Sequence, residues 1–120
     1  MSCDCSQTRH FRWGPTRFTS SGENDLLLSV DLGGAREVSG TLTVLGVSGS
    51  SPTLDVVLID GPENDALYMG DTTSGAFTQM SSTGNTKLYI TEFSRFMNYK
   101  VSLGGSSPEF TVVIDLYSKG

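Results

Sequence analysis

The residue types that most often carry catalysis are scarce in this chain. It has one histidine, His10, so Ser-His-Asp or Cys-His catalysis would have to use that residue. His10 lies in a stretch for which we expect no formed pocket. The sequence also has no phosphate-binding loop, no zinc-ligand spacing and no Gly-x-Ser-x-Gly elbow. Paired carboxylates are available, but their positions in the chain do not place two of them across a cleft. We therefore expect that the protein is not an enzyme and that it binds no cofactor.

Metal binding is also not expected. Cys3 and Cys5 are separated by one residue, and a disulfide between them would close a tiny, strained loop. Their thiolates suit a soft metal, but a four-coordinate site needs two further ligands and the chain has a single histidine. The turn at residues 60–65, Asp-Gly-Pro-Glu-Asn-Asp, is rich in oxygen ligands for Ca²⁺ but lacks EF-hand spacing. We interpret it as a solvated turn, and the cysteines as reduced thiols without a structural role.

The beginning of the chain is the most distinctive part for binding. Residues 1–14 are interpreted as an extended arm without regular periodicity, preceding a β domain at residues 15–120. The arm mixes aromatic and basic side chains, which are enriched at binding hot spots, so it is the predicted partner-binding site. Its candidate residues are Arg9, His10, Phe11, Arg12 and Trp13. The alternative is that Trp13 covers the open end of its own domain.

The charge of the chain is unevenly distributed. Residues 1–18 hold three arginines and one aspartate (3 − 1 = +2), whereas residues 19–120 hold five basic and twelve acidic residues (5 − 12 = −7). An acidic body argues against nucleic-acid binding, which needs a basic face. No apolar run approaches the length of a membrane span, and no signal peptide is evident. We expect neither a nucleic-acid nor a membrane partner, and we expect synthesis in the cytoplasm.

A repeated tetrapeptide organises the rest of the chain. Gly-Ser-Ser-Pro occurs at residues 49–52 and again at 105–108, each time between two β-rich runs. Glycine and serine favour a chain reversal, and proline donates no N–H to a ladder, so each copy predicts a strand, a tight turn and a returning strand. Gly40, Gly46 and Asn98 are expected at bulges.

Short apolar runs between turn residues define the fold class. Further strands are predicted at residues 15–20, 26–32, 66–69, 76–80 and 87–93, and no stretch has helical spacing with caps. These elements predict an all-β fold: a jelly-roll-like β-sandwich of eight or nine short antiparallel strands, with the extended N-terminal arm.

Both copies of Gly-Ser-Ser-Pro stand next to distinctive strands. The first is followed by Leu-Asp-Val-Val-Leu at residues 54–58, and the second is preceded by an Arg-aromatic strand from Arg95 and followed by Phe110 to Leu116. With these features, residues 40–117 resemble small β-sandwich virion proteins of tailed bacteriophages. This resemblance implies a capsid decoration, or cement, protein located on the capsid surface of the virion. Its partners would be the major capsid protein and copies of itself, with a trimer as one arrangement.

Two alternatives remain open. One is a structural protein of the tail or neck, which differs mainly in location. The other is a carbohydrate-binding module, which needs exposed aromatic side chains in a row; the available ones are Trp13, Tyr68, Tyr89 and Tyr117. Because Tyr89 and Tyr117 lie within predicted strands, packing in the core or at an edge is the more common use of such residues.

Overall fold

The structure is a computed structural model that describes residues 8–20, 22–23 and 29–120, so Cys3 and Cys5 lie outside the described residues. The described part is all-β, which confirms the predicted class. Its strands are β1 (Thr8–Phe18), β2 (Gly22–Glu23), β3 (Val30–Asp31), β4 (Glu37–Gly61), β5 (Gly70–Ala76), β6 (Gly84–Ile90) and β7 (Phe96–Lys119). A short 3-10 helix, η2 (Ala66–Tyr68), precedes β5.

Two very long strands, β4 and β7, form the centre of the sheet. They pair with each other in antiparallel register from Glu37↔Lys119 at one end to Gly61↔Phe96 at the other. The sheet order is β1-β7-β4-β5, with β2 and β3 added on β7 and β6 added on β4. The hydrogen bonding therefore describes one antiparallel sheet, with seven strands in the described residues. It does not confirm the expected jelly-roll sandwich of eight or nine strands.

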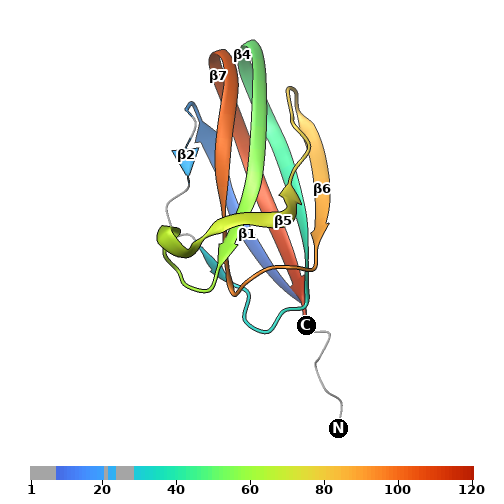
Figure 1. Ribbon diagram of the computed structural model, residues 1–120. Helices are drawn as coiled ribbons and strands as arrows, with labels where there is room; N and C mark the ends of the chain where they lie inside the picture. Colours follow the sequence, from blue (N-terminus) through green and yellow to red (C-terminus); the bar gives the residue numbers. More distant parts are fainter. Residues whose placement is uncertain (1–7, 21, 24–28) are drawn as a thin grey trace.

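Both copies of Gly-Ser-Ser-Pro lie in the middle of these long strands and bend them. The chain reverses at each copy, as predicted, and the two bends lie together at the end of the molecule away from the C-terminus (Figure 1). The expected hairpins are wrong, however, because the halves of one bent strand do not pair with each other. Residues 37–48 of β4 pair with 109–119 of β7, and residues 53–61 pair with 96–104.

The two bends pack reciprocally. A Cβ atom added at Gly49 would lie 2.7 Å from the carbonyl oxygen of Ser107, and one added at Gly105 would lie 2.5 Å from that of Ser51. Gly49 and Gly105 have φ of 113° and 99°, and Ser51 and Ser107 both have φ of 49°. Both bends therefore use left-handed backbone at matching positions, and each glycine leaves room for the main chain of the other copy.

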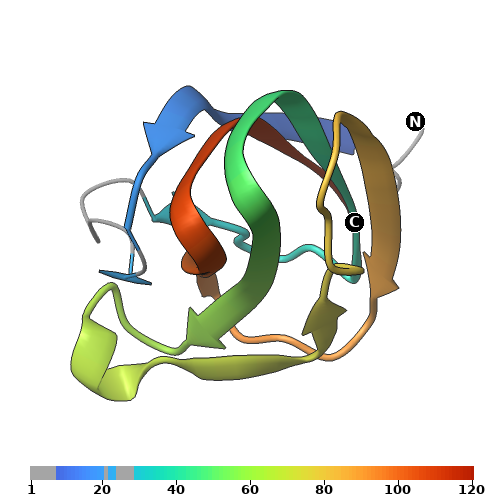
Figure 2. The ribbon, with the colours of Figure 1, turned by 90° about the horizontal axis from the view of Figure 1, so that it is seen from above.

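Bending the sheet encloses one hydrophobic core between its halves (Figure 2). Alternate residues of each half of β4 and β7 point inward, as the period of two requires. The core residues on β4 are Val38, Leu42, Val44, Leu54, Val56 and Leu58; on β7 they are Met97, Tyr99, Val101, Phe110, Val112, Ile114 and Leu116. Alternation in the sequence predicts Val38, Leu42, Val44 and Val47 as inward positions; the first three are confirmed, while Val47 is only partly buried against this core, as is Leu103 of β7.

Residues 8–14 are not an arm. They form most of β1, which pairs with β7 from Thr8↔Lys119 to Phe18↔Phe110, with a shift in register between Trp13 and Thr16. The structure thus places the boundary expected after residue 14 inside a strand, next to the cis peptide bond between Gly14 and Pro15.

Several local expectations between residues 66 and 103 are also wrong. Residues 66–68 form the helix η2 rather than a strand, and residues 70–75, between two predicted strands, belong to β5. No bulge occurs at Asn98, because the register with β4 runs without a shift from Gly61 to Thr53. Asn98 is buried and donates from Nδ2 to the Ser29 hydroxyl at 2.9 Å.

An exposed ion pair connects Asp31 of β3 to Arg95, the residue before β7. Arg95 donates to both carboxylate oxygens of Asp31, at 3.0 and 2.8 Å, and the Gly33 N–H donates to the same carboxylate at 2.9 Å. The Arg95 hydrogen bond, followed by that of Gly33, lowers the pKa of Asp31 from 3.8 to about 2. A carboxylate whose pKa is lower in the folded state stabilises the fold above its ordinary pKa, and this contribution disappears as the pH falls toward 2.

We therefore expect the Asp31 carboxyl to titrate at about 2 in an NMR pH titration. In Arg95→Gln its midpoint should rise toward the ordinary value but stay below it, because the Gly33 hydrogen bond remains. Arg36→Gln is the control, since Arg36 does not contact this carboxylate through any described side-chain interaction and should leave the midpoint unchanged. An unchanged midpoint in Arg95→Gln would contradict the assignment.

Candidate binding surfaces

The five residues predicted to bind a partner lie together on β1, but they point to two different faces of the sheet. Trp13 is only 5% exposed and belongs to the hydrophobic core, where its ring lies 5.0 Å from that of Tyr99. Phe11 is half-buried against the same core. His10 and Arg12 are exposed on the outer face. Trp13 is thus part of its own domain, in line with the alternative interpretation, and is not accessible to a partner.

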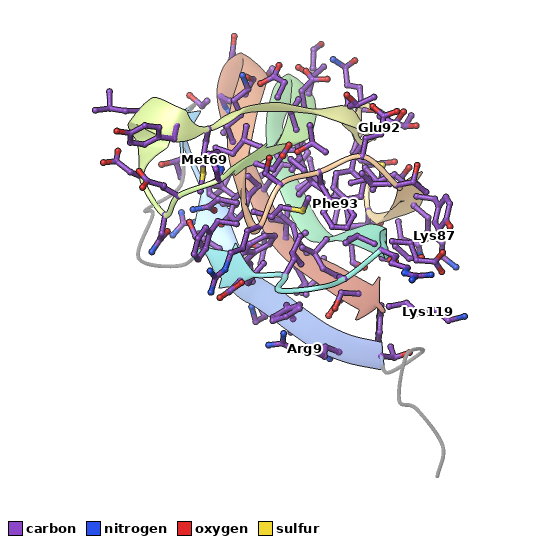
Figure 3. All side chains as sticks on the ribbon, turned by 60° about the horizontal axis from the view of Figure 1, so that its bottom comes forward. Arg9, Met69, Lys87, Glu92, Phe93 and Lys119 are labelled. Atoms are coloured by element: carbon purple, nitrogen blue, oxygen red, sulfur yellow. The ribbon has the colours of Figure 1, made fainter. Side chains whose placement is uncertain are left out.

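Arg9 is exposed near the end of β1, and its guanidinium lies 4.9 Å from the centre of the Phe11 ring. Figure 3 shows Arg9 and Lys119 at one side of the molecule, where β1 and β7 meet, with Met69 toward the opposite side.

Asp115 of β7 connects the two outward-facing residues of β1. Its Oδ1 lies 2.7 Å from Nε2 of His10 and accepts a hydrogen bond of 2.8 Å from Nε of Arg12. Burial alone would raise the pKa of Asp115, but the hydrogen bonds and charges of Arg12 and His10 together lower it below its ordinary value. The carboxylate is therefore ionised at neutral pH, and it holds both side chains in place.

Aromatic side chains stand on the same outer face. Tyr117 is 46% exposed and Tyr89 is 55% exposed. The imidazole of His10 stacks on the Tyr117 ring, with centroids 4.5 Å apart and planes 11° from parallel. The Tyr89 hydroxyl donates to Glu37 Oε2 at 2.7 Å. Both tyrosine side chains are thus fixed by neighbours while much of their surface stays open to solvent.

A second surface lies at the tip formed by η2. Leu67 is 89% exposed, which is the highest exposure of any large apolar side chain in the described residues. Its N–H donates to Asp65 Oδ1 at 3.0 Å, and the Tyr68 N–H donates to the Asp65 carbonyl at 3.0 Å. The turn at residues 60–65 therefore leads into a hydrogen-bonded helical turn that displays a leucine.

A shallow acidic hollow of about 380 Å³ separates β5 from the segment before β7. Asp60 lines the hollow and accepts hydrogen bonds from the Thr72 hydroxyl at 2.6 Å and the Ser94 N–H at 2.5 Å. Asp71, also in the lining, pairs with Lys100 at 2.6 Å. Asp60 and Asp71 are thus engaged with protein groups, and the described residues contain no group of three or more His, Cys, Asp or Glu arranged to hold a metal ion.

In the part of the chain that the structure describes, no helix has the length and apolar character needed to cross a membrane.

The sequence interpretation missed the role of Asp115, Tyr117 and Tyr89 as one surface. The available signal was the alternation Asp115, Tyr117 and Lys119 along the last strand, which places the three on one face. The partners of Asp115 and Tyr117 on β1 do not follow from the sequence, because residues 8–14 are expected from it to form an arm.

Comparisons with known proteins find a similar fold but do not identify a family. No protein-family model and no curated protein matches the chain. Among solved structures, the SPBc2 prophage-derived protein YomS is similar over 100% of this chain and 99% of its own, with a TM-score of 0.55 and 15% identity. PirA has a TM-score of 0.45 at 9% identity, and a Bacillus endospore appendage protein of disulfide-linked pili has 0.43 at 8%. The similarity to PirA covers 98% of this chain and 96% of PirA. The similarity to the appendage protein covers 99% of this chain and 96% of that protein. At 15% identity, the similarity to YomS shows a shared fold.

Proposed function

We propose that the protein is a structural subunit of a tailed-bacteriophage particle, and specifically a capsid decoration protein that binds the outside of the head. The observation that carries the proposal is the match in fold to a prophage-derived protein, which spans nearly the full length of both chains. The resemblance of residues 40–117 to small phage virion proteins points the same way. Its partners would be the major capsid protein and further copies of itself.

Leu67 is the residue that we expect to anchor the protein on the shell. A leucine that is 89% exposed gains free energy when a partner covers it, by roughly 1.5–3 kcal/mol for full burial. η2 holds this side chain at a tip that projects from the compact sheet (Figure 2), so it can enter a recess between capsid subunits. If several copies associate, each would add one such contact, and the contacts would reinforce one another.

The test is cosedimentation of the purified protein with empty shells of the cognate major capsid protein that lack decoration. We expect the wild-type protein to bind and Leu67→Asp to bind at least about tenfold more weakly, because a charge cannot enter an apolar recess without a partner. Leu45→Asp is the matched control, since Leu45 is 54% exposed on β4 and away from η2. Circular dichroism of each variant serves to check that it is folded.

Failure of the wild-type protein to bind shells would overturn the decoration proposal. Immunogold labelling of intact particles distinguishes the alternatives, because labelling of the tail or neck would retain a virion role and contradict the head location. An equal loss of shell binding in Leu67→Asp and Leu45→Asp would contradict the assignment of Leu67 as the anchor. The mass of the free protein in solution shows whether copies associate before they bind.

A further inference from the structure

Four residues form a row across the outer face of the sheet. His10, Tyr117, Ser39 and Tyr89 are register partners on the neighbouring strands β1, β7, β4 and β6. Residues in one register position share a face, so their side chains all project to the same side. We call this set the tyrosine row. Its two tyrosines are separated by two strand spacings, or about 10 Å between backbones.

The rings of the tyrosine row are held in position before any ligand arrives. His10 covers one face of the Tyr117 ring, so the other ring face is directed away from β1 and toward Ser39. Ser39 is small and exposed, and it leaves the space between the two tyrosines open. Glu37 fixes the hydroxyl of Tyr89. Binding therefore costs little side-chain entropy, which favours affinity.

We propose that the tyrosine row binds a neutral, β-linked polysaccharide. Aromatic rings bind sugars through the C–H groups on the face of a pyranose, while neighbouring hydroxyl and charged side chains hydrogen-bond to its hydroxyls. An extended β-linked chain can lie across the strands and meet both tyrosine rings, and Ser39 and Thr41 between them supply hydroxyl groups on the same face.

The charges of this face favour a neutral ligand. Arg12 is neutralised by Asp115, and Glu37 is engaged by Tyr89. Two lysines also lie on this face: Lys119 is the register partner of Glu37, and Lys87 lies in the register row of Asp115. The basic side chains thus stand in different rows, each of which also holds a carboxylate, and they do not form the cluster that an anionic polymer would need. The helical turn η2, which displays Leu67, lies on the opposite side of the molecule from β1 (Figure 2). A subunit anchored through η2 would thus leave the tyrosine row free.

This inference goes beyond the proposed function and is tested separately from it. The probes are chitohexaose, cellohexaose and laminarihexaose, each titrated into the full chain by isothermal calorimetry, with the ring resonances of His10 and both tyrosines followed by NMR. We expect at least one oligosaccharide to bind and to shift these ring resonances. Tyr117→Ala and Tyr89→Ala should each weaken binding by about tenfold.

Tyr68→Ala is the matched control, because Tyr68 is 54% exposed but belongs to η2. It should bind the oligosaccharide as the wild-type protein does. The inference is overturned if none of the three sugars binds, or if Tyr68→Ala loses as much affinity as the two row variants. Either result leaves the capsid assay unaffected, since that assay reads binding to shells through Leu67.

Discussion

Replacing Gly105 with alanine is expected to lower the free energy of unfolding by about 3 kcal/mol or more. The new Cβ would lie 2.5 Å from the carbonyl oxygen of Ser51 and 2.7 Å from that of Ser50. Both neighbours are main-chain atoms in the other bend, so they cannot move aside as a flexible side chain can. The φ of 99° adds strain for any residue with a Cβ.

The matched substitution at the other bend, Gly49→Ala, should have a similar effect, because its Cβ would meet Ser107 in the same way. Gly34→Ala is the control, since a Cβ there would have no neighbour within 4 Å. Urea or thermal unfolding followed by circular dichroism measures all three, with a decrease in Tm of roughly 10 °C expected for the bend variants. If Gly105→Ala lowers the free energy of unfolding no more than Gly34→Ala does, the bends do not pack as described.

The second large effect is expected at Trp13. Its side chain is 5% exposed and packs on Tyr99, so Trp13→Ala should cost about 3–5 kcal/mol through lost burial and the cavity left behind. Tyr68→Ala also removes an aromatic ring, but from an exposed position, and should lower the free energy of unfolding far less. Chemical denaturation gives both values, and comparable costs for the two variants would contradict the buried position of Trp13.

A shortened chain extends this test to the whole of β1. Starting the chain at residue 15 removes Trp13 and six of the nine register pairs between β1 and β7, whereas starting it at residue 8 keeps all nine. We expect the first variant to lose cooperative unfolding and the second to retain it. The longer deletion would therefore abolish capsid or sugar binding through unfolding, and it is unsuitable for locating an anchor.

The all-β class and most inward positions of β4 could be predicted from the sequence because they depend on local alternation. Leu54, Val56 and Leu58 alternate with polar or half-buried residues, and all three are fully buried. The two Gly-Ser-Ser-Pro copies also identified the points where the chain reverses. The pairing partners of the resulting halves could not be read locally, because a turn sequence is equally compatible with a hairpin and with a bent strand that pairs elsewhere.

β1 was missed although a signal was present. Phe11 and Trp13 alternate with His10 and Arg12, which is the period of a strand with one buried face. Aromatic and basic residue types are also typical of an interface, and an alternation over so few residues does not by itself identify a strand. Asp115, which fixes His10 and Arg12, lies more than one hundred positions away in the chain, so no local pattern could have joined them.

The pairing of β4 with β7 also has a kinetic consequence. The nearest partners, Gly61 and Phe96, are 96 − 61 = 35 positions apart, and the most distant, Glu37 and Lys119, are 119 − 37 = 82 apart. Closing the shorter loop costs less entropy, so pairing should begin there, proceed to the bends and finish beside the C-terminus. A topology dominated by such distant contacts folds in milliseconds to seconds, and β1 can join the sheet only after residues 110–119 have been synthesised and placed.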